Sequence, residues 1–430
     1  MRGLRIVALA ALAAAIAVPA WGQGLPRAQK PEEVGLSSER LKRLGEAMRE
    51  GVEKGDVPGA VALIARNGKV AYLEGFGFRD REAKAPMKPD AIFRIASMTK
   101  PMVSLAIMML AEEGKLSIAY PVSRYLPAFK EAKVGVEKKK DDGSIELELV
   151  APQREMTVQD LLRHTSGLTY GVFGNSRVDK MYLEASLFDR NQTNEQFVAK
   201  LAKLPLKHQP GTIWEYSVAT DVLGRIVEVV SGQPLDQFIA ERIAKPLRMA
   251  DSGFWVEAAK KDRIAEPQND PKTGKRPSMR DVTEKPTFMS GGGGMVSTAA
   301  DYARFSQLWL NGGQLDGVRL VSRKTVELMT SDHLPPGIRV SPGASLNPNS
   351  LAPTPERALG FGLGFAVRLG TGRSPMYGST GEFFWAGAGG TNFVIDPKEK
   401  LIAVLMLQAP SQLNPYRNLM RQLAYQALTD

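Results

Sequence analysis

Apolar residues recur at regular spacing along most of the chain and predict its elements in turn. Residues 39–54 carry an apolar stripe at helical spacing, made of Leu41, Leu44, Met48 and Val52, which predicts an amphipathic helix. Two apolar stretches, 60–66 and 69–76, flank Asn67-Gly68. An Asn-Gly pair between apolar strands predicts a tight β-hairpin.

A long apolar run over residues 102–110 predicts a second helix, which ends at Gly114. Pro101 suits its first turn, where a missing backbone N–H is tolerated. Ser97 then lies at the helix N-terminus, where free N–H groups favour developing negative charge. Lys100 follows three residues later, so its ammonium can turn back to the Ser97 hydroxyl.

The middle of the chain is mainly helical. The charged stretch 131–150 predicts a surface loop or a small hairpin, and helical patterns follow at residues 157–162, 185–250 and 301–310. The run 291–294 is all glycine, which permits close backbone approach, so it predicts a tight crossing rather than a linker. Residues 338–358 are rich in Pro, Ser and Asn and predict a long loop.

Near the C-terminus, alternating apolar patterns predict strands at 361–367, 393–395 and 401–407, the last two joined as a hairpin, and a closing helix at 415–428. Strands at both ends of the chain predict an α/β (α+β) fold, an antiparallel sheet flanked by helices with an inserted helical lobe. We expect one catalytic unit over residues 23–430. Its α/β lobe would cover about 30–115 and 290–430 and its helical lobe about 116–289, with a cleft between them as the site.

The first 22 residues have the pattern of a secretory signal peptide. Arg2 and Arg5 precede an Ala- and Leu-rich run, and small residues follow at Ala20 and Gly22. The apolar run is too short for a membrane span. We therefore expect cleavage after Ala20 or Gly22 and export, to the periplasm or beyond, with no stable membrane insertion afterwards. The chain has no cysteine, which is compatible with a bacterial periplasm.

Charge and composition exclude several classes of protein. Hydrophobic residues make up 43% of the 430 residues and charged residues 24%, values typical of a globular protein. Removing Arg2 and Arg5 lowers the formal net charge from +10 to +8, and the basic residues left are dispersed among nearly as many acids. Because aromatic residues and arginines do not alternate in any stretch, we expect no nucleic-acid partner.

Ser97 and Lys100 are candidates for covalent catalysis. A serine hydroxyl is a weak nucleophile until a neighbouring base takes its proton. A lysine that is partly buried can act as that base, and the Ser-x-x-Lys pattern occurs in penicillin-recognising hydrolases. Taken alone, the tetrapeptide also fits a serine N-cap followed by a solvated lysine.

Two further segments carry candidate chemistry. Residues 210–217 include Tyr216, and a tyrosine beside a lysine can act as a general base, although a half-buried packing aromatic fits equally. Residues 381–391 combine glycines and small residues just before a strand. An edge strand of this kind could bring a backbone N–H to a carbonyl oxygen and, with the N–H of Ser97, form an oxyanion hole. The alternative is a glycine-rich turn that closes a hairpin.

In this order and at these separations, the three motifs resemble the serine β-lactamase and penicillin-binding-protein superfamily, near the class C β-lactamases. The best match is the family VIII carboxylesterases, which share the β-lactamase fold. The resemblance spans residues 33–428, and the stretches 161–168 and 292–298 support it. It implies no cofactor, no metal ion and a small-molecule ester as substrate.

The resemblance also implies a role for each residue that matches a motif. Ser97 would be the nucleophile, Lys100 its activating partner and Tyr216 the catalytic tyrosine. The segment from Trp385 through Gly387 stands where β-lactamases carry Lys-Thr-Gly, and the backbone N–H of Ala388 would complete the oxyanion hole.

Two departures from β-lactamases bear on the substrate. Val218 stands where their Tyr-x-Asn motif has the asparagine that holds the antibiotic's amide, and Trp385 replaces the lysine that helps to bind its carboxylate. Both favour neutral, apolar, short-chain esters, and some members of this branch retain weak cephalosporin hydrolysis. A β-lactamase, a DD-peptidase, an amidase and a non-catalytic ligand sensor are the alternatives on the same scaffold.

The other candidate residues have structural interpretations. The chain has three histidines, His164, His208 and His333, without metal-ligand spacing, and no Gly-x-Ser-x-Gly elbow. We expect His164 to be structural at a helix end, Asp160 and Glu215 to be solvated or capping, and Trp214 and Trp255 to pack. The sequence leaves open the natural substrate, the acyl length, the oligomeric state and the role of the 338–358 loop.

Overall fold

The computed structural model describes residues 24–345 and 351–430, so the predicted signal peptide lies outside the described residues. Its centre is an eight-stranded sheet in the order β12-β13-β14-β15-β16-β1-β2-β3. The strands are β1 Gly59–Arg66, β2 Lys69–Asp80, β3 Ala85–Pro86, β12 Leu359–Phe361, β13 Ala366–Arg368, β14 Phe383–Ala386, β15 Asn392–Asp396 and β16 Leu401–Leu407. Antiparallel pairing of β1 with β16 joins the two ends of the chain. The predicted antiparallel sheet is confirmed.

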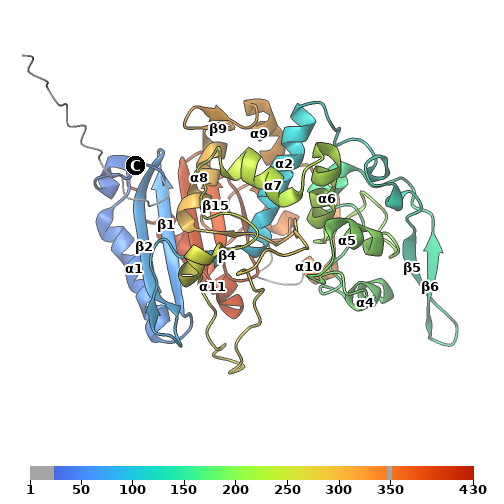
Figure 1. Ribbon diagram of the computed structural model, residues 1–430, viewed down its shortest axis with the longest axis horizontal. Coiled ribbons are helices and arrows are strands. Elements are labelled where there is room, and N and C mark those ends of the chain that lie inside the picture. Colours follow the sequence, from blue (N-terminus) through green and yellow to red (C-terminus); the bar gives the residue numbers. More distant parts are fainter. Residues whose placement is uncertain (1–23, 346–350) are drawn as a thin grey trace, which may run out of the picture.

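Helices cover both faces of this sheet (Figure 1). Alternate residues of β1 and β16 enter two different cores, as the two-residue period of a strand requires. Ala62 and Leu405 pack with α1 (Ser38–Glu53) and α11 (Leu413–Tyr425). Leu63 and Val404 pack on the other side, in the core that includes α2 (Lys100–Glu112) and α8 (Ala299–Leu310).

The hairpin at residues 59–80 forms as predicted. Asn67 and Gly68 both have positive φ, 52° and 77°, the conformation that a two-residue hairpin turn needs. The single strand predicted at residues 361–367 is wrong. This stretch contains the end of β12, a turn and the start of β13, and the two strands form another hairpin. Glycines at 362 and 364 interrupt the run, and Gly364 has a φ of 101°, so the chain reverses between β12 and β13.

Helices are the commonest regular elements of the middle of the chain, as predicted, and the charged stretch 131–150 forms the small hairpin of β5 (Val134–Lys139) and β6 (Ile145–Val150). The remaining helices are α3 Val158–Leu162, α4 Arg177–Glu184, α5 Asn194–Leu201, α6 Ala219–Ser231, α7 Leu235–Ile239, α9 Arg323–Thr330 and α10 Pro342–Ser345. Short strands pair as β4 (Phe93–Arg94) with β8 (Val296–Ser297), β7 (Ile213–Trp214) with β11 (Arg339–Val340), and β9 (Gln314–Leu315) with β10 (Val318–Arg319).

The division into two lobes stays a prediction. No helix of the described ranges has the length and apolarity that a membrane crossing needs.

The glycine run 291–294 crosses the start of α6, and the predicted tight crossing is confirmed. A Cβ atom at Gly291 would lie 2.5 Å from the carbonyl oxygen of Thr220. At Gly293, Cβ would lie 3.7 Å from the backbone of Ala96, the residue before Ser97. The run therefore brings α6 and the Ser97 segment close together because it has no side chains.

Candidate active site

Ser97 lies in a 3₁₀ turn, Ala96–Thr99, that leads directly into α2. Ala96 has a positive φ of 44°, a strained conformation for a residue with a side chain. The Ser97 side chain is half-buried. Sequence and structure thus agree that the candidate nucleophile stands at the beginning of the buried helix α2.

Lys100 is almost completely buried, with 2% of its surface exposed. Its Nζ lies 3.2 Å from Ser97 Oγ, 3.0 Å from the hydroxyl of Tyr170 and 2.6 Å from the carbonyl oxygen of Gly292. An ammonium has three N–H donors, and these three oxygens match them. Of the three, only the carbonyl is restricted to accepting, so the two hydroxyls can also donate to a neutral amine.

Tyr216 and Trp385 complete the group that the sequence predicts. Lys100 Nζ lies 4.7 Å from the centre of the Tyr216 ring, so the catalytic tyrosine candidate meets the lysine with its ring face. Trp385 Nε1 donates to the Tyr216 hydroxyl at 3.3 Å. The structure therefore gathers Ser97, Lys100, Tyr216 and Trp385 at one place.

Tyr170 is a site residue that sequence reasoning missed. Besides its hydrogen bond with Lys100, its ring lies 5.3 Å from that of Tyr216. Burial, with the nearby groups of Tyr216 and Asp221, raises the pKa of Tyr170 well above its usual value, so its hydroxyl stays protonated at neutral pH. Its one sequence signal is its position two residues after the stretch 161–168.

The turn after β14 faces the segment before Ser97. β14 lies between β13 and β15, so the expected edge strand is wrong, and the small residues form the turn that joins β14 to β15. The Thr391 hydroxyl donates to the carbonyl of Ile95 at 3.2 Å, and a Cβ at Gly387 would lie 2.3 Å from that carbonyl. Within the described residues, the backbone N–H groups of Ser97 and Ala388 have no hydrogen-bond partner, as donors of an oxyanion hole require.

His164 packs against the ring of Tyr216, 4.9 Å away between ring centres. It is buried at the end of α3, and burial, followed by the charge of Lys100, lowers its pKa well below the usual value. Its Nδ1 lies 3.3 Å from the Ser217 hydroxyl oxygen, a contact that fits the structural role that we expect. Trp214 is also buried, as expected for a packing residue.

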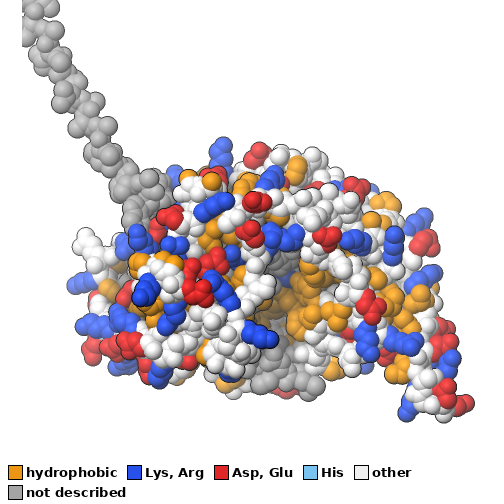
Figure 2. Space-filling view, turned by 60° about the horizontal axis from the view of Figure 1, so that its bottom comes forward, with side chains coloured by type: hydrophobic (Ala, Val, Ile, Leu, Met, Phe, Trp, Pro, Cys, Tyr) orange, Lys and Arg blue, Asp and Glu red, His pale blue; other side chains and the backbone are white. Residues whose placement is uncertain are grey.

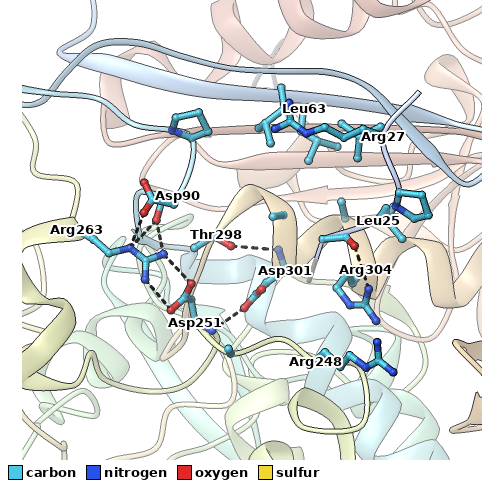
Figure 3. A pocket seen from close by; sticks show the side chains of 18 of the residues that line it. Leu25, Arg27, Leu63, Asp90, Arg248, Asp251, Arg263, Thr298, Asp301 and Arg304 are labelled. Atoms are coloured by element: carbon cyan, nitrogen blue, oxygen red, sulfur yellow. Dashed lines mark hydrogen bonds and ion pairs between the residues drawn. The ribbon is translucent and has the colours of Figure 1, made fainter. Parts of the chain in front are cut away.

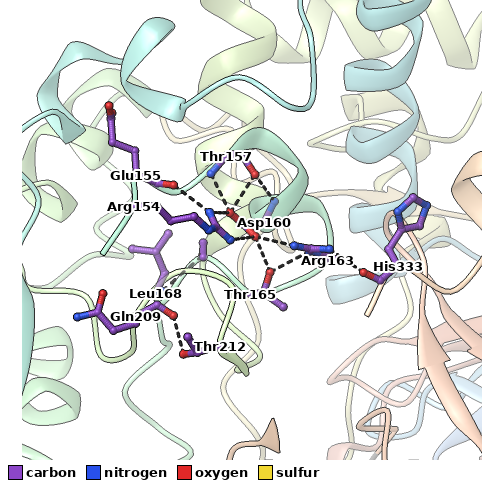
Figure 4. A network of polar contacts seen from close by, with 11 residues as sticks. Arg154, Glu155, Thr157, Asp160, Arg163, Thr165, Leu168, Gln209, Thr212 and His333 are labelled. Atoms are coloured by element: carbon purple, nitrogen blue, oxygen red, sulfur yellow. Dashed lines mark hydrogen bonds and ion pairs between the residues drawn. The ribbon is translucent and has the colours of Figure 1, made fainter. Parts of the chain in front are cut away.

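Two carboxylates beside the site, Asp160 and Glu215, are buried. The expectation that they are solvated or capping holds for Asp160, which belongs to the capping box of α3, and is wrong for Glu215. Asp160 caps α3 and accepts from Arg154, Arg163 and Thr165 (Figure 4). Glu215 accepts from the Thr169 hydroxyl at 2.9 Å and from Lys207 Nζ at 3.1 Å. Asp160 precedes the segment 163–170, and Glu215 precedes Tyr216. Their hydrogen bonds therefore help to fix the segments that carry Tyr170 and Tyr216.

These carboxylates predict a loss of stability in acid. Burial by itself would raise both pKa values, but hydrogen bonds and nearby cations, chiefly Arg154 for Asp160 and His208 for Glu215, lower each to about 2. Each group therefore contributes on the order of 2 kcal/mol above pH 4, and that contribution disappears as the pH falls from about 4 towards 2. Urea unfolding at a series of pH values measures it.

The variant Asp160→Asn tests the assignment. We expect it to be less stable than the wild type at pH 7 but to lose less stability between pH 4 and pH 3. An unchanged pH dependence in this variant would contradict the assignment to Asp160.

A cavity of 1270 Å³ lies elsewhere, bordered by strands β1 and β2 and by α8 (Figure 3). None of the predicted site residues lines it. Its acidic side chains have partners, since Arg263 pairs with Asp90 and Asp251, and Asp301 accepts from the backbone of Asp251. The size of a cavity therefore does not identify the candidate active site of this protein. The chemistry of Ser97 and Lys100 identifies it.

Comparison with known proteins identifies the family of the chain. The family model described as Beta-lactamase matches residues 44–426. Protein Rv1367c of Mycobacterium tuberculosis (strain ATCC 25618 / H37Rv) is 36% identical over 372 residues, 84% of this chain and 88% of that protein. Esterase EstB of Burkholderia gladioli is 34% identical over 284 residues, 61% of this chain and 68% of EstB.

Among solved structures, EstCE1, described as a hydrolase with promiscuous acyltransferase activity, superposes with a TM-score of 0.72 at 28% identity. The match covers 90% of this chain and 99% of EstCE1. The fold and site thus define a serine hydrolase with the β-lactamase fold. The chain belongs to the beta-lactamase family, and the resemblance to the family VIII carboxylesterases within that superfamily is confirmed.

Proposed function

We propose that the protein is an exported serine carboxylesterase that hydrolyses short-chain acyl esters through a Ser97 acyl-enzyme. The observation that carries the proposal is the 3.2 Å contact between Ser97 Oγ and Lys100 Nζ, in a site walled by aromatic rings. The relative named as an esterase and the structural neighbour named as a hydrolase support it.

In the first half-reaction, Ser97 Oγ attacks the ester carbonyl carbon, and its proton passes to Tyr216 with the help of Lys100. The N–H groups of Ser97 and Ala388 stabilise the oxyanion. The intermediate collapses as the ester C–O bond breaks, and the alcohol leaves with that proton. Water then attacks the acyl-enzyme and gives its proton to the same base, which releases the acid and restores Ser97.

The surroundings of Ser97 favour a neutral, apolar substrate. Trp385 and Val218 are buried where β-lactamases have a lysine and an asparagine. Those positions therefore offer neither a cation for a substrate carboxylate nor a side-chain amide for hydrogen bonds to a substrate amide. Phe173 and Phe188, both partly exposed, pack against Tyr170. Figure 2 shows apolar side chains gathered on one part of the surface, while charges of both signs are spread over the rest. The proposal includes a low rate of cephalosporin hydrolysis.

A rate comparison on the purified protein tests the proposal. It uses a p-nitrophenyl acyl series, nitrocefin and a D-Ala-D-Ala peptide. Dominant turnover of short-acyl esters supports an esterase, whereas faster nitrocefin or peptide turnover assigns the protein to the β-lactamases or DD-peptidases. A covalent adduct that never turns over, with any of these compounds, identifies a ligand sensor. Export is tested by N-terminal sequencing of periplasmic protein, which should begin at Trp21 or Gln23.

Trp385→Phe is expected to lower kcat about fivefold and to leave KM nearly unchanged. The substitution keeps an aromatic ring but removes the hydrogen bond to the Tyr216 hydroxyl, and one neutral bond is worth about 1 kcal/mol. The matched control is Trp309→Phe in α8, because Trp309 Nε1 is buried without a partner among the described residues. Equal kcat values for the two variants would show that the Trp385 bond does not orient Tyr216.

A further inference from the structure

A buried carboxylate lies behind Lys100, and the ester mechanism above does not use it. Asp221 belongs to the first turn of α6 and is 1% exposed. Its Oδ1 accepts from the Ser290 hydroxyl at 2.6 Å and from the Gly292 N–H at 3.0 Å. Its Oδ2 has no hydrogen-bond partner within the described ranges. Because burial of a carboxylate is unfavourable without compensation, a nearby cation is expected.

Gly292 connects this carboxylate to the lysine. The N–H of Gly292 is held by Asp221, and its carbonyl accepts from Lys100 Nζ at 2.6 Å. A Cβ at position 292 would lie 2.4 Å from Asp221 Oδ2 and 3.1 Å from the Tyr170 hydroxyl oxygen. The free carboxylate oxygen and the Tyr170 hydroxyl therefore border the same small space beside Lys100, and glycine is required there.

The charges of Asp221 and Lys100 act on each other. Burial raises the pKa of Asp221, and the charge of Lys100 together with the donors Ser290 and Gly292 opposes that rise. The Asp221 carboxylate and the Lys100 ammonium therefore attract each other.

The other titratable groups that face Lys100 are Tyr170, Tyr216 and His164. Of these, Tyr170 and His164 stay neutral at neutral pH, as their pKa directions require. A further carboxylate, that of Glu215, acts on His164 and is bonded to Lys207 and Thr169.

We propose that Asp221 is a positioning residue for Lys100, the group that assists Tyr216 as the base. Its carboxylate fixes the glycine run on which the ammonium is held, and it supplies the buried negative charge that the ammonium faces. The three groups that contact Lys100 Nζ directly, two hydroxyls and a carbonyl, are uncharged, so they cannot provide it. The inference rests on the proposed function, because it concerns the group that activates Ser97.

Asp221→Asn tests the proposal, because asparagine keeps the shape and one acceptor oxygen but removes the charge. We expect the acidic limb of the kcat/KM profile for a p-nitrophenyl ester to move to lower pH by about one unit, since a nearby opposite charge holds a proton on a base. On the plateau, kcat should fall about tenfold, because a Lys100 that is no longer held in place helps Tyr216 less in taking the serine proton. A merely structural role would change thermal stability and leave the limb in place.

Glu228→Gln is the matched control. It removes a carboxylate from the same helix, at a residue bonded to Asn194 and Arg225, and it should leave the pH profile unchanged. Gly292→Ala is a second variant that keeps the Asp221 charge but forces a methyl group against it. It should lower kcat about tenfold or more without moving the limb. Wild-type kcat in Gly292→Ala, or an unmoved limb in a folded Asp221→Asn, would overturn the proposal.

Failure of this inference can be distinguished from failure of the proposed function. If the wild type hydrolyses no ester, the proposed function fails. The role of Asp221 is then decided by the pH dependence with which a fluorophosphonate labels Ser97, followed by mass spectrometry. A shift of that profile to lower pH in Asp221→Asn supports the positioning role, and identical profiles overturn it.

Discussion

Replacing Ser97 with alanine is expected to reduce ester turnover by a factor of about 10⁴ or more, while the protein stays folded. Loss of the nucleophile removes the covalent route, and the activity that remains reflects binding and oxyanion stabilisation alone. The fold should be unaffected, because the Ser97 side chain is half-buried and the bonds that hold its turn come from Thr99, Met98 and Thr391. Hydrolysis of p-nitrophenyl butyrate and the thermal unfolding midpoint measure the two effects.

A second serine in α2 provides the control for this result. Ser104 is buried seven residues later and faces the β12–β13 connection, since a Cβ at Gly364 would lie 2.6 Å from its Oγ. Ser104→Ala should keep wild-type turnover. Mass spectrometry during turnover should find an acyl group on wild-type protein and none on Ser97→Ala. Near-wild-type activity in the latter would refute the acyl-enzyme mechanism.

Local patterns were sufficient to predict the elements that frame the site. The hairpin around Asn67-Gly68, the helix α1 and the buried helix α2 each depend on residues that are close in sequence. The order of elements predicted a sheet built from both ends of the chain, and the pairing of β1 with β16 confirms it. The strand predicted at 361–367 failed because apolar alternation was given more weight than its two glycines, which signal a reversal.

The candidate site was only partly predictable. Ser97 and Lys100 share one helical turn, so a short motif reveals them, and the structure places Tyr216 and Trp385 beside them. Tyr170 and Gly292 meet Lys100 from 70 and 192 residues away, and no periodicity encodes such contacts. Asp221, Asp160 and Glu215 are charged residues within ordinary helical or loop patterns. Their burial depends on partners supplied by other segments, which the sequence alone does not show.

Glu382→Gln is expected to destabilise the protein by about 3–5 kcal/mol, the largest stability effect that the described structure predicts for a single charge. Glu382 is fully buried directly before β14, where it accepts from Arg368 Nε at 2.6 Å, from Arg421 and from the Tyr425 hydroxyl at 2.8 Å. The two guanidinium groups are also buried. Removing the carboxylate charge leaves both without compensation, which costs far more than an exposed ion pair contributes.

Urea unfolding at pH 7 measures this loss, and Glu327→Gln is the control. Glu327 pairs with Lys324 on the surface of α9, so its replacement should leave the unfolding midpoint unchanged. Because Glu382 joins β14 to α11, and β14 carries Trp385, we also expect the Glu382→Gln variant to lose ester turnover at a lower temperature than the wild type. A variant as stable as the wild type would show that water or rearrangement compensates the two arginines, and that β14 is held by its sheet hydrogen bonds alone.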